Sequence, residues 1–226
     1  MSKSAIGILF AAAAAWVGTV CAYYFGYEQL PERVPVHFDI NGIADGWTTR
    51  DQLLPFWLIV PGFCTFLLAI GLVLPAVAPS LVGREGVRSK YEFVLFLAAL
   101  LMGMVQTMVI TSSFGIQFDF GRVVLALVFA FFGLIGYAMR GLKRNPVMGI
   151  RLPWTLRSDA IWDETHRAAA RMYMGVGSIG AACAMTGILS SGPGIIVAIV
   201  SLFLFAAIVP IIYSVIVARR IERLPR

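Results

Sequence analysis

The sequence predicts an all-α membrane protein with six transmembrane helices and with both termini in the cytoplasm. Hydrophobic residues make up 59% of the 226 residues and charged residues only 13%, which is too little charge to cover a soluble protein. Six apolar stretches are long enough to cross a bilayer, and the basic residues fall mostly into alternate connections between them. The alternating polarity typical of a transmembrane β-barrel is absent from these stretches.

Each predicted span is an apolar run without an acidic or basic residue in its interior. A helix needs about 20 such residues to cross the hydrocarbon core of a bilayer. The first run continues as far as Tyr24 and exceeds the core of a typical signal peptide, so a retained helix is expected. The six spans are predicted at Ala5–Phe25, Leu53–Val77, Tyr91–Ser112, Val123–Met139, Met172–Leu189 and Ile195–Val217.

The distribution of Lys and Arg predicts the orientation of these spans. Of the 18 basic residues, all but Arg33, Arg50 and Arg122 lie in the N-terminus, the second loop, the fourth loop and the C-terminal tail. Because basic connections stay in the cytoplasm, these four segments are predicted to be cytoplasmic. The chain then divides into two three-span halves, residues 1–113 and 114–226.

The outer loop, residues 26–52, is predicted to form a small extracytoplasmic β-hairpin. Apolar and polar side chains alternate over residues 36–40, as in a half-buried strand. The pair Asn41 and Gly42 that follows suits the positive φ angles of a tight hairpin turn. Trp47 is expected near the lipid headgroups, where tryptophan is enriched.

The outer loop also supplies the first set of candidate binding residues. Its five acidic residues would attract a cationic ligand. The oxygen-bearing side chains between His37 and Asp45 do not have the spacing of a calcium-binding loop, and turn chemistry accounts for them. No metal or cofactor is therefore predicted. The candidates for ligand binding on this side are His37, Asp39, Asp45 and Trp47.

The inner loop, residues 140–171, is predicted to be irregular at first and then helical. Proline and glycine punctuate its first part. Ser158 is typical of a helix start, because its hydroxyl can accept a hydrogen bond from a free backbone amide. The helix would carry Trp162 and His166 on one face and would lie in the membrane interface, anchored by Trp154 and Trp162.

The inner loop supplies the second set of candidates, for binding a partner: Asn145, Arg151, Trp154, Trp162, Asp163 and His166. An acid–base group of Asp163, Glu164 and His166 would suit an alternative function, that of a membrane enzyme or small-molecule carrier. No nucleophile motif accompanies this group, however, and ion pairing with nearby arginines, such as that of Asp163 with Arg167, explains its charges. No catalytic residue is therefore predicted.

Two stretches of the sequence resemble a bacterial protein family. The stretch KRNPVMGIRLPWTLRSDAIWDETHRAAARM, residues 143–172, closely resembles the signature of the SdpI-type immunity family. The stretch LPERVPVHFDINGIADGW, residues 30–47, resembles a module of unknown function that precedes this signature in many such proteins. The matching positions are Asn145, Gly149, Arg151, Pro153, Trp154, Thr155, Ser158, Trp162, Thr165 and His166 in the first stretch, and Pro31, Pro35, His37, Gly42, Asp45 and Trp47 in the second.

The resemblance implies a multi-pass protein of the bacterial cytoplasmic membrane that protects the cell against a secreted, membrane-active peptide toxin. It also implies signal transduction, in which the toxin-bound protein holds a cytoplasmic transcriptional repressor at the membrane. The implied partners are membrane lipid, the toxin and the repressor, without direct contact to nucleic acid. The acidic outer loop suits a cationic peptide, and the basic inner loop suits an acidic partner or anionic lipid.

Overall fold

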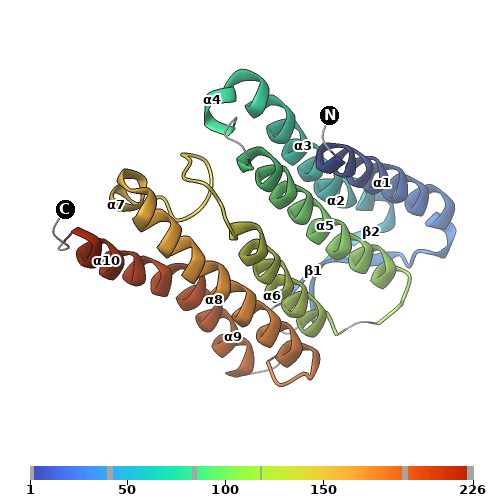
Figure 1. The fold of residues 1–226 in the computed structure, drawn as a ribbon. Helices are drawn as coiled ribbons and strands as arrows, with labels where there is room; N and C mark the ends of the chain where they lie inside the picture. Colours follow the sequence, from blue (N-terminus) through green and yellow to red (C-terminus); the bar gives the residue numbers. More distant parts are fainter. Residues whose placement is uncertain (1–2, 40–42, 83–85, 118, 190–192, 223–226) are drawn as a thin grey trace.

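In a computed structural model of the chain, residues 3–39, 43–82, 86–117, 119–189 and 193–222 are described. Long helices make up most of this part of the chain, and one β-hairpin follows the first helix (Figure 1). The helices are α1 (Lys3–Gly26), α2 (Leu53–Trp57), α3 (Ile59–Val77), α4 (Pro79–Val82), α5 (Val87–Ser113), α6 (Phe120–Met139), α7 (Pro153–Arg157), α8 (Asp159–Met185), α9 (Pro193–Phe203) and α10 (Val209–Glu222). The strands are β1 (Arg33–Phe38) and β2 (Ala44–Thr49), and a π-helical segment, Leu204–Ile208, joins α9 to α10.

Helices occupy most of the described residues of all six predicted spans. By length and composition, five helical segments could cross a membrane: Ile6–Gln29, Arg50–Val77, Val87–Ser113, Phe120–Met139 and Pro193–Glu222. The predicted span at residues 172–189 falls in the second half of α8, which is not among the five. Glycine and serine dilute its apolar residues. The chain is therefore a mostly helical membrane protein with five candidate spans.

The first group of packed helices consists of α1, α3 and α5. Small buried side chains, Ala12, Cys64 and Ala99, lie where the three helices meet. The buried amide of Gln106 in α5 donates hydrogen bonds to the Thr19 hydroxyl at 3.3 Å and to the Trp57 carbonyl at 2.8 Å. This polar side chain is thus satisfied within the helix group, as a buried amide requires.

The second group consists of α6, α8 and α10, and the contact between α6 and α8 is the most extensive in the molecule. Glycines make this close approach possible, because a Cβ atom at Gly177 would overlap the backbone of Gly133, and one at Gly136 would lie 2.7 Å from the Cβ of Tyr173. Small residues serve the same purpose in packed membrane helices generally. Helices α5 and α6 pack on each other and join the two groups.

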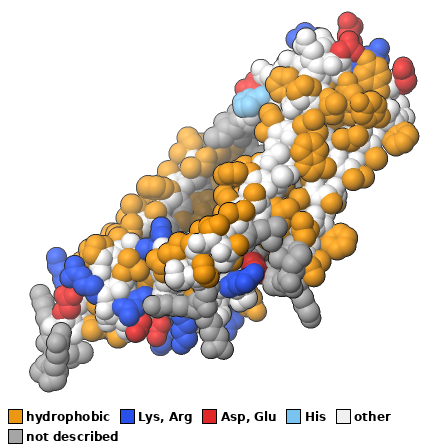
Figure 2. All heavy atoms as spheres, turned by 90° about the horizontal axis from the view of Figure 1, so that it is seen from above, with side chains coloured by type: hydrophobic (Ala, Val, Ile, Leu, Met, Phe, Trp, Pro, Cys, Tyr) orange, Lys and Arg blue, Asp and Glu red, His pale blue; other side chains and the backbone are white. Residues whose placement is uncertain are grey.

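The connections gather at two opposite ends of the helices. The start of α1, α4, α7 and the end of α10 lie toward one end, and the hairpin, the end of α5 and the start of α9 lie toward the other (Figure 1). Hydrophobic side chains cover the region between them in the space-filling view, whereas charged side chains gather toward the ends (Figure 2). This distribution is the one expected of helices surrounded by lipid.

The predicted hairpin is confirmed. Strands β1 and β2 pair antiparallel, with Val34 opposite Thr48 and His37 opposite Gly46. Glycine suits this last position, because a Cβ at Gly46 would lie 2.8 Å from the Cβ of His37. The predicted turn pair, Asn41 and Gly42, lies outside the described residues.

Candidate functional site

In the inner segment, residues 140–171, the irregular part before α8 folds back on that helix through a network of buried polar contacts. Asn145, which is 2% exposed, fixes the first turn of this part. The Asn145 side-chain oxygen accepts hydrogen bonds from the amides of Val147 and Met148 at 2.9 and 2.8 Å, and its amide group donates to the Lys143 carbonyl at 2.8 Å. One side chain thereby fixes the turn that directs the chain back toward α8.

The centre of the inner segment is His166, whose two ring nitrogens are both engaged. Its Nδ1 lies 2.9 Å from the Trp162 carbonyl, and its Nε2 accepts a hydrogen bond from the Ile150 amide at 2.9 Å. Because a backbone amide can only donate, Nε2 carries no proton and the imidazole is neutral with its proton on Nδ1. Burial lowers the pKa of His166, although the Trp162 carbonyl and the nearby Asp163 oppose this shift.

The conformation of residues 149–155 depends on glycine and threonine. Gly149 has φ +105°, and a Cβ atom there would overlap Nε2 of His166. Thr155 is fully buried; its hydroxyl lies 2.7 Å from the Ile150 carbonyl and accepts from the Leu152 amide at 2.9 Å. Gly149 and Thr155 are both positions of the family pattern, and these contacts give each of them a structural role.

The structure corrects the predicted interfacial helix. The helix that begins after Ser158, whose hydroxyl accepts from the Ile161 amide as predicted, continues without a break to Met185. Trp162 is 0% exposed, stacks on the His166 ring with centroids 3.8 Å apart and donates to the Leu142 carbonyl. It therefore cannot anchor the helix to lipid headgroups. Its apolar face packs against protein instead.

The remaining inner candidates are distributed over different contacts. Trp154 donates to the Ser214 hydroxyl of α10 at 3.0 Å, and Arg151 donates to the Pro146 carbonyl. Glu164 pairs with Arg220 of α10. The predicted ion pair of Asp163 with Arg167 is not found among the described residues. The acid–base group of the alternative function is thus dispersed, since Glu164 is paired and His166 has no free nitrogen.

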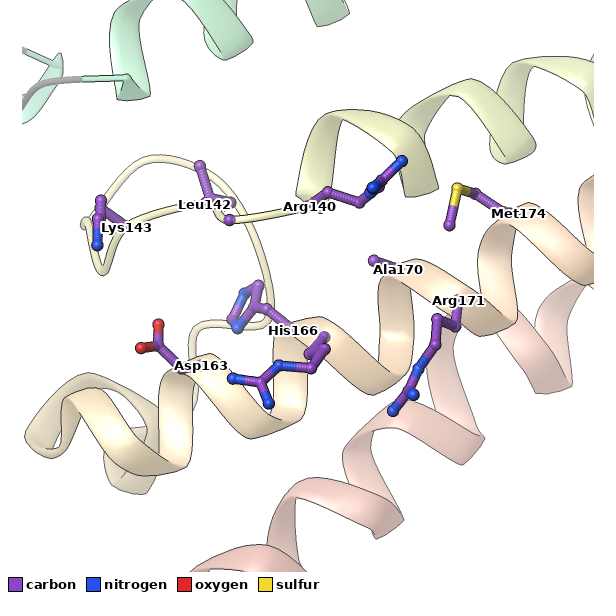
Figure 3. A pocket seen from close by; sticks show the side chains of 10 residues that line it. Arg140, Leu142, Lys143, Asp163, His166, Ala170, Arg171 and Met174 are labelled. Carbon is purple, nitrogen blue, oxygen red and sulfur yellow. The ribbon is translucent and has the colours of Figure 1, made fainter.

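A pocket of about 490 Å³ lies between the start of the inner segment and α8 (Figure 3). Asp163 and His166 line this pocket, whereas Arg151 does not. The pocket is also lined by basic residues that are not among the candidates predicted from the sequence. The basic lining residues come from the end of α6, from the irregular segment and from α8: Arg140, Lys143, Arg167 and Arg171. The basic composition of the segment was visible in the sequence, but its convergence on one pocket was not.

The outer candidates lie together on the hairpin. Nδ1 of His37 and a carboxylate oxygen of Asp45 are 2.5 Å apart across the two strands. Asp39 closes the hairpin end, since its backbone amide donates to the Ile43 carbonyl and its carboxylate accepts from the Ile43 amide, both at 2.8 Å. Trp47 is 50% exposed, and the Arg33 guanidinium lies 6.0 Å from the centroid of its ring.

An apolar groove of about 440 Å³ runs beneath the hairpin between α5, α6 and α9. His37 and Asp39 line it at the hairpin, and valine, leucine and isoleucine side chains line the rest. Phe38 also lines it and stacks on Phe120 at the start of α6, with ring centroids 4.1 Å apart. The sequence predicts neither this groove nor the pairing of the two phenylalanines. No periodic pattern links two residues so far apart in the chain.

Among the described residues, no group of three or more His, Cys, Asp and Glu side chains could hold a metal ion. The contacts described above instead define two surfaces at opposite ends of a helical membrane protein: an apolar groove under a hairpin and a basic pocket beside a histidine-centred fold. The hairpin lies in one of the two regions in which the sequence matches known families, and all the pocket residues except Arg140 lie in the other.

Residues 141–214 match the model of the SdpI/YfhL protein family, and residues 8–60 match a domain of unknown function (DUF1648). Immunity protein SdpI of Bacillus subtilis (strain 168) is 21% identical over 157 residues, which cover 68% of this chain and 70% of that protein. No solved structure matches the chain significantly.

The fold and its two surfaces define the class, a multi-pass helical membrane protein. Within that class, the C-terminal half of the chain is similar to the SdpI/YfhL family, and most of the chain is similar to an immunity protein. The resemblance predicted from the sequence is confirmed.

Proposed function

We propose that this protein protects a bacterial cell against a secreted, membrane-active peptide. Its relationship to an immunity protein supports this proposal. In the proposed topology the chain crosses the cytoplasmic membrane six times, the second half of α8 being the additional span, and both termini are cytoplasmic. The two helix groups are then the halves 1–113 and 114–226. The small residues of α8 suit a span that packs against α6 more than against lipid.

The groove under the hairpin is the feature that supports binding of the peptide. It combines an apolar interior with His37 and Asp39 at the hairpin. A cationic, amphipathic peptide could place apolar side chains between α6 and α9 and its charged groups near the acidic hairpin. Binding there would keep the peptide from inserting into the bilayer.

Survival of a sensitive bacterium that produces the chain tests this function against a panel of cationic membrane-active peptides. Ile199→Trp would fill the groove, because Ile199 lines it and is 48% exposed. Val197→Trp on the same helix is the matched control, since Val197 is 55% exposed and is not among the groove-lining residues. We expect protection to be lost with Ile199→Trp and kept with Val197→Trp. The proposal is wrong if the unaltered protein protects against no peptide.

The proposed topology has a separate test by cysteine labelling in a cysteine-free variant. Thr49 on the hairpin and Arg157 on α7 are both exposed. We expect a membrane-impermeant maleimide to label Thr49→Cys in intact cells, and Arg157→Cys only after lysis. Labelling of both residues from the same side would overturn the division into an outer and an inner surface.

The family resemblance supports a second step, in which the peptide-bound protein holds a cytoplasmic repressor through its inner face. This step needs a small repressor encoded next to the gene. A fluorescent fusion of that repressor should move to the membrane when the peptide is added, and should remain dispersed in cells that lack the protein. Repressor that remains dispersed in both strains would exclude signalling but not protection.

A further inference from the structure

Four basic residues from three segments line the pocket beside His166. Arg140 directly follows α6, Lys143 lies in the irregular segment, and Arg167 and Arg171 lie on α8 (Figure 3). All four are exposed. Asp163 is the acidic residue of the lining. Like charges held around one space repel each other unless an anion lies between them.

Other basic residues at this end of the molecule already have acidic partners. Arg144 lies 2.8 Å from Asp159, and Arg88 lies 2.9 Å from Glu92. For Lys143, Arg167 and Arg171 no ion pair is found among the described residues. The positive charge of the pocket is therefore not balanced by the part of the chain that the structure describes.

The pocket has an apolar side as well as a basic one. Leu142, Ala170 and Met174 line it, and Met174 lies one turn beyond Ala170, in the half of α8 that packs along α6. A soluble anion would use only the basic residues. A lipid offers a phosphate to the basic residues and acyl chains to the apolar side, as basic pockets between membrane helices do.

We propose that this pocket binds the phosphate group of an anionic membrane lipid. The inference rests on the proposed membrane topology but not on immunity. Two hydrogen bonds hold the pocket wall in place, from Trp162 to the Leu142 carbonyl at 2.7 Å and from the Ile150 amide to His166. The site is thus formed before the lipid arrives, which reduces the entropy lost on binding.

The test uses the purified full chain in detergent, with native mass spectrometry to count bound phosphatidylglycerol or phosphatidylcholine. The double variant Arg167→Gln/Arg171→Gln removes two pocket charges. Arg157→Gln/Arg219→Gln is the control, because both residues are exposed and neither lines the pocket. We expect phosphatidylglycerol affinity to fall about fivefold for each pocket arginine removed, and by no more than about twofold in the control. Gel filtration verifies that both variants remain folded.

Four outcomes would overturn the inference. An equal loss in the control would assign binding to diffuse surface charge, and equal retention of phosphatidylcholine would remove the role of lipid charge. Displacement of phosphatidylglycerol by polyglutamate at a lower concentration than by inorganic phosphate would favour an acidic protein partner. Displacement of phosphatidylglycerol by inorganic phosphate at the same concentration as the lipid would show a phosphate site without lipid preference. None of these measurements depends on cell survival, so failure of the lipid-binding inference would not contradict the proposed immunity function.

Discussion

The imidazole of His166 accepts a hydrogen bond from the backbone amide of Ile150, a residue 16 positions earlier in the chain. This contact joins the irregular inner segment to α8. The His166 ring also stacks on Trp162, whose indole donates to the Leu142 carbonyl in the same segment. The wall of the basic pocket is therefore held by two aromatic side chains one helical turn apart.

Gly149 makes the approach of Ile150 to His166 possible, so Gly149→Ala should destabilise the protein. The new Cβ would overlap Nε2 of His166, and φ +105° is unfavourable for alanine. We expect a loss of about 2 kcal/mol or more in the free energy of unfolding, measured by thermal or denaturant unfolding in detergent.

Gly141→Ala is the matched control, because Gly141 also has a positive φ, +61°, but a Cβ there would meet nothing within 4 Å. Its expected cost is only about 1 kcal/mol, from backbone strain alone. Equal costs for the two variants would mean that the contact with His166 does not require glycine.

Acidification should destabilise the protein through His166. Burial lowers the His166 pKa in the folded protein, while the unfolded chain keeps an ordinary value near about 6.5. The stabilising contribution of neutral His166 is therefore complete above about pH 6.5 and is lost as the pH falls toward the folded-state pKa. Protonation of Nε2 also places two donors against each other at Ile150. The midpoint of thermal unfolding should fall between about pH 7 and about pH 5.

His166→Gln tests whether this pH dependence belongs to His166, because glutamine does not titrate. The variant should unfold at a lower temperature than the unaltered protein at neutral pH, and its midpoint should vary less over the same interval. If the midpoint of the variant falls as steeply on acidification as that of the unaltered protein, other groups are responsible.

The parts of the fold that depend on local signals could be predicted from the sequence. The alternation over residues 36–40 predicted the hairpin, and Ser158 predicted the start of α8. The surroundings of Trp162 could not be predicted, because an apolar helix face looks the same whether lipid or protein covers it. Here residues 142–150 provide the cover, and their irregular backbone has no periodicity to reveal it.

The candidate surfaces were predictable only in part, for the same reason. The sequence places individual residues of both surfaces, such as His37 and His166, in long connections, but their neighbours come from distant segments. Phe38 meets Phe120, and Lys143 shares a pocket with Arg171. Such meetings depend on how helices pack, which composition and spacing do not determine.

The crossing of α6 and α8 should not tolerate a side chain at Gly177. Its Cβ would overlap the backbone of Gly133, which cannot move without separating the two helices. Gly177→Ala should therefore lower the free energy of unfolding by about 1–3 kcal/mol, measured by denaturant unfolding in detergent. Gly175→Ala lies on the same helix with nothing within 4 Å of its Cβ and should be neutral or stabilising by up to about 1 kcal/mol. A neutral Gly177→Ala would contradict the close crossing.

The hydroxyl of Tyr173 in α8 donates a hydrogen bond to the carbonyl of Ala206, in the π-helical segment before α10. Ala206 precedes Pro210 by four residues, and proline has no amide hydrogen to satisfy that carbonyl. Tyr173 therefore replaces the hydrogen bond that residue 210 would donate in a regular α-helix. Tyr173→Phe should cost about 1 kcal/mol in the free energy of unfolding, since the carbonyl loses this donor in an apolar environment.

Combining Tyr173→Phe with Pro210→Ala in a double-mutant cycle tests this explanation. Alanine at position 210 restores an amide that can donate to the Ala206 carbonyl, so the loss of the tyrosine hydroxyl should then matter less. We expect Tyr173→Phe to cost less than half as much in the Pro210→Ala background as in the unaltered protein. An unchanged cost would mean that the hydroxyl of Tyr173 does not substitute for the amide that Pro210 lacks, and that the π-helical segment has another origin.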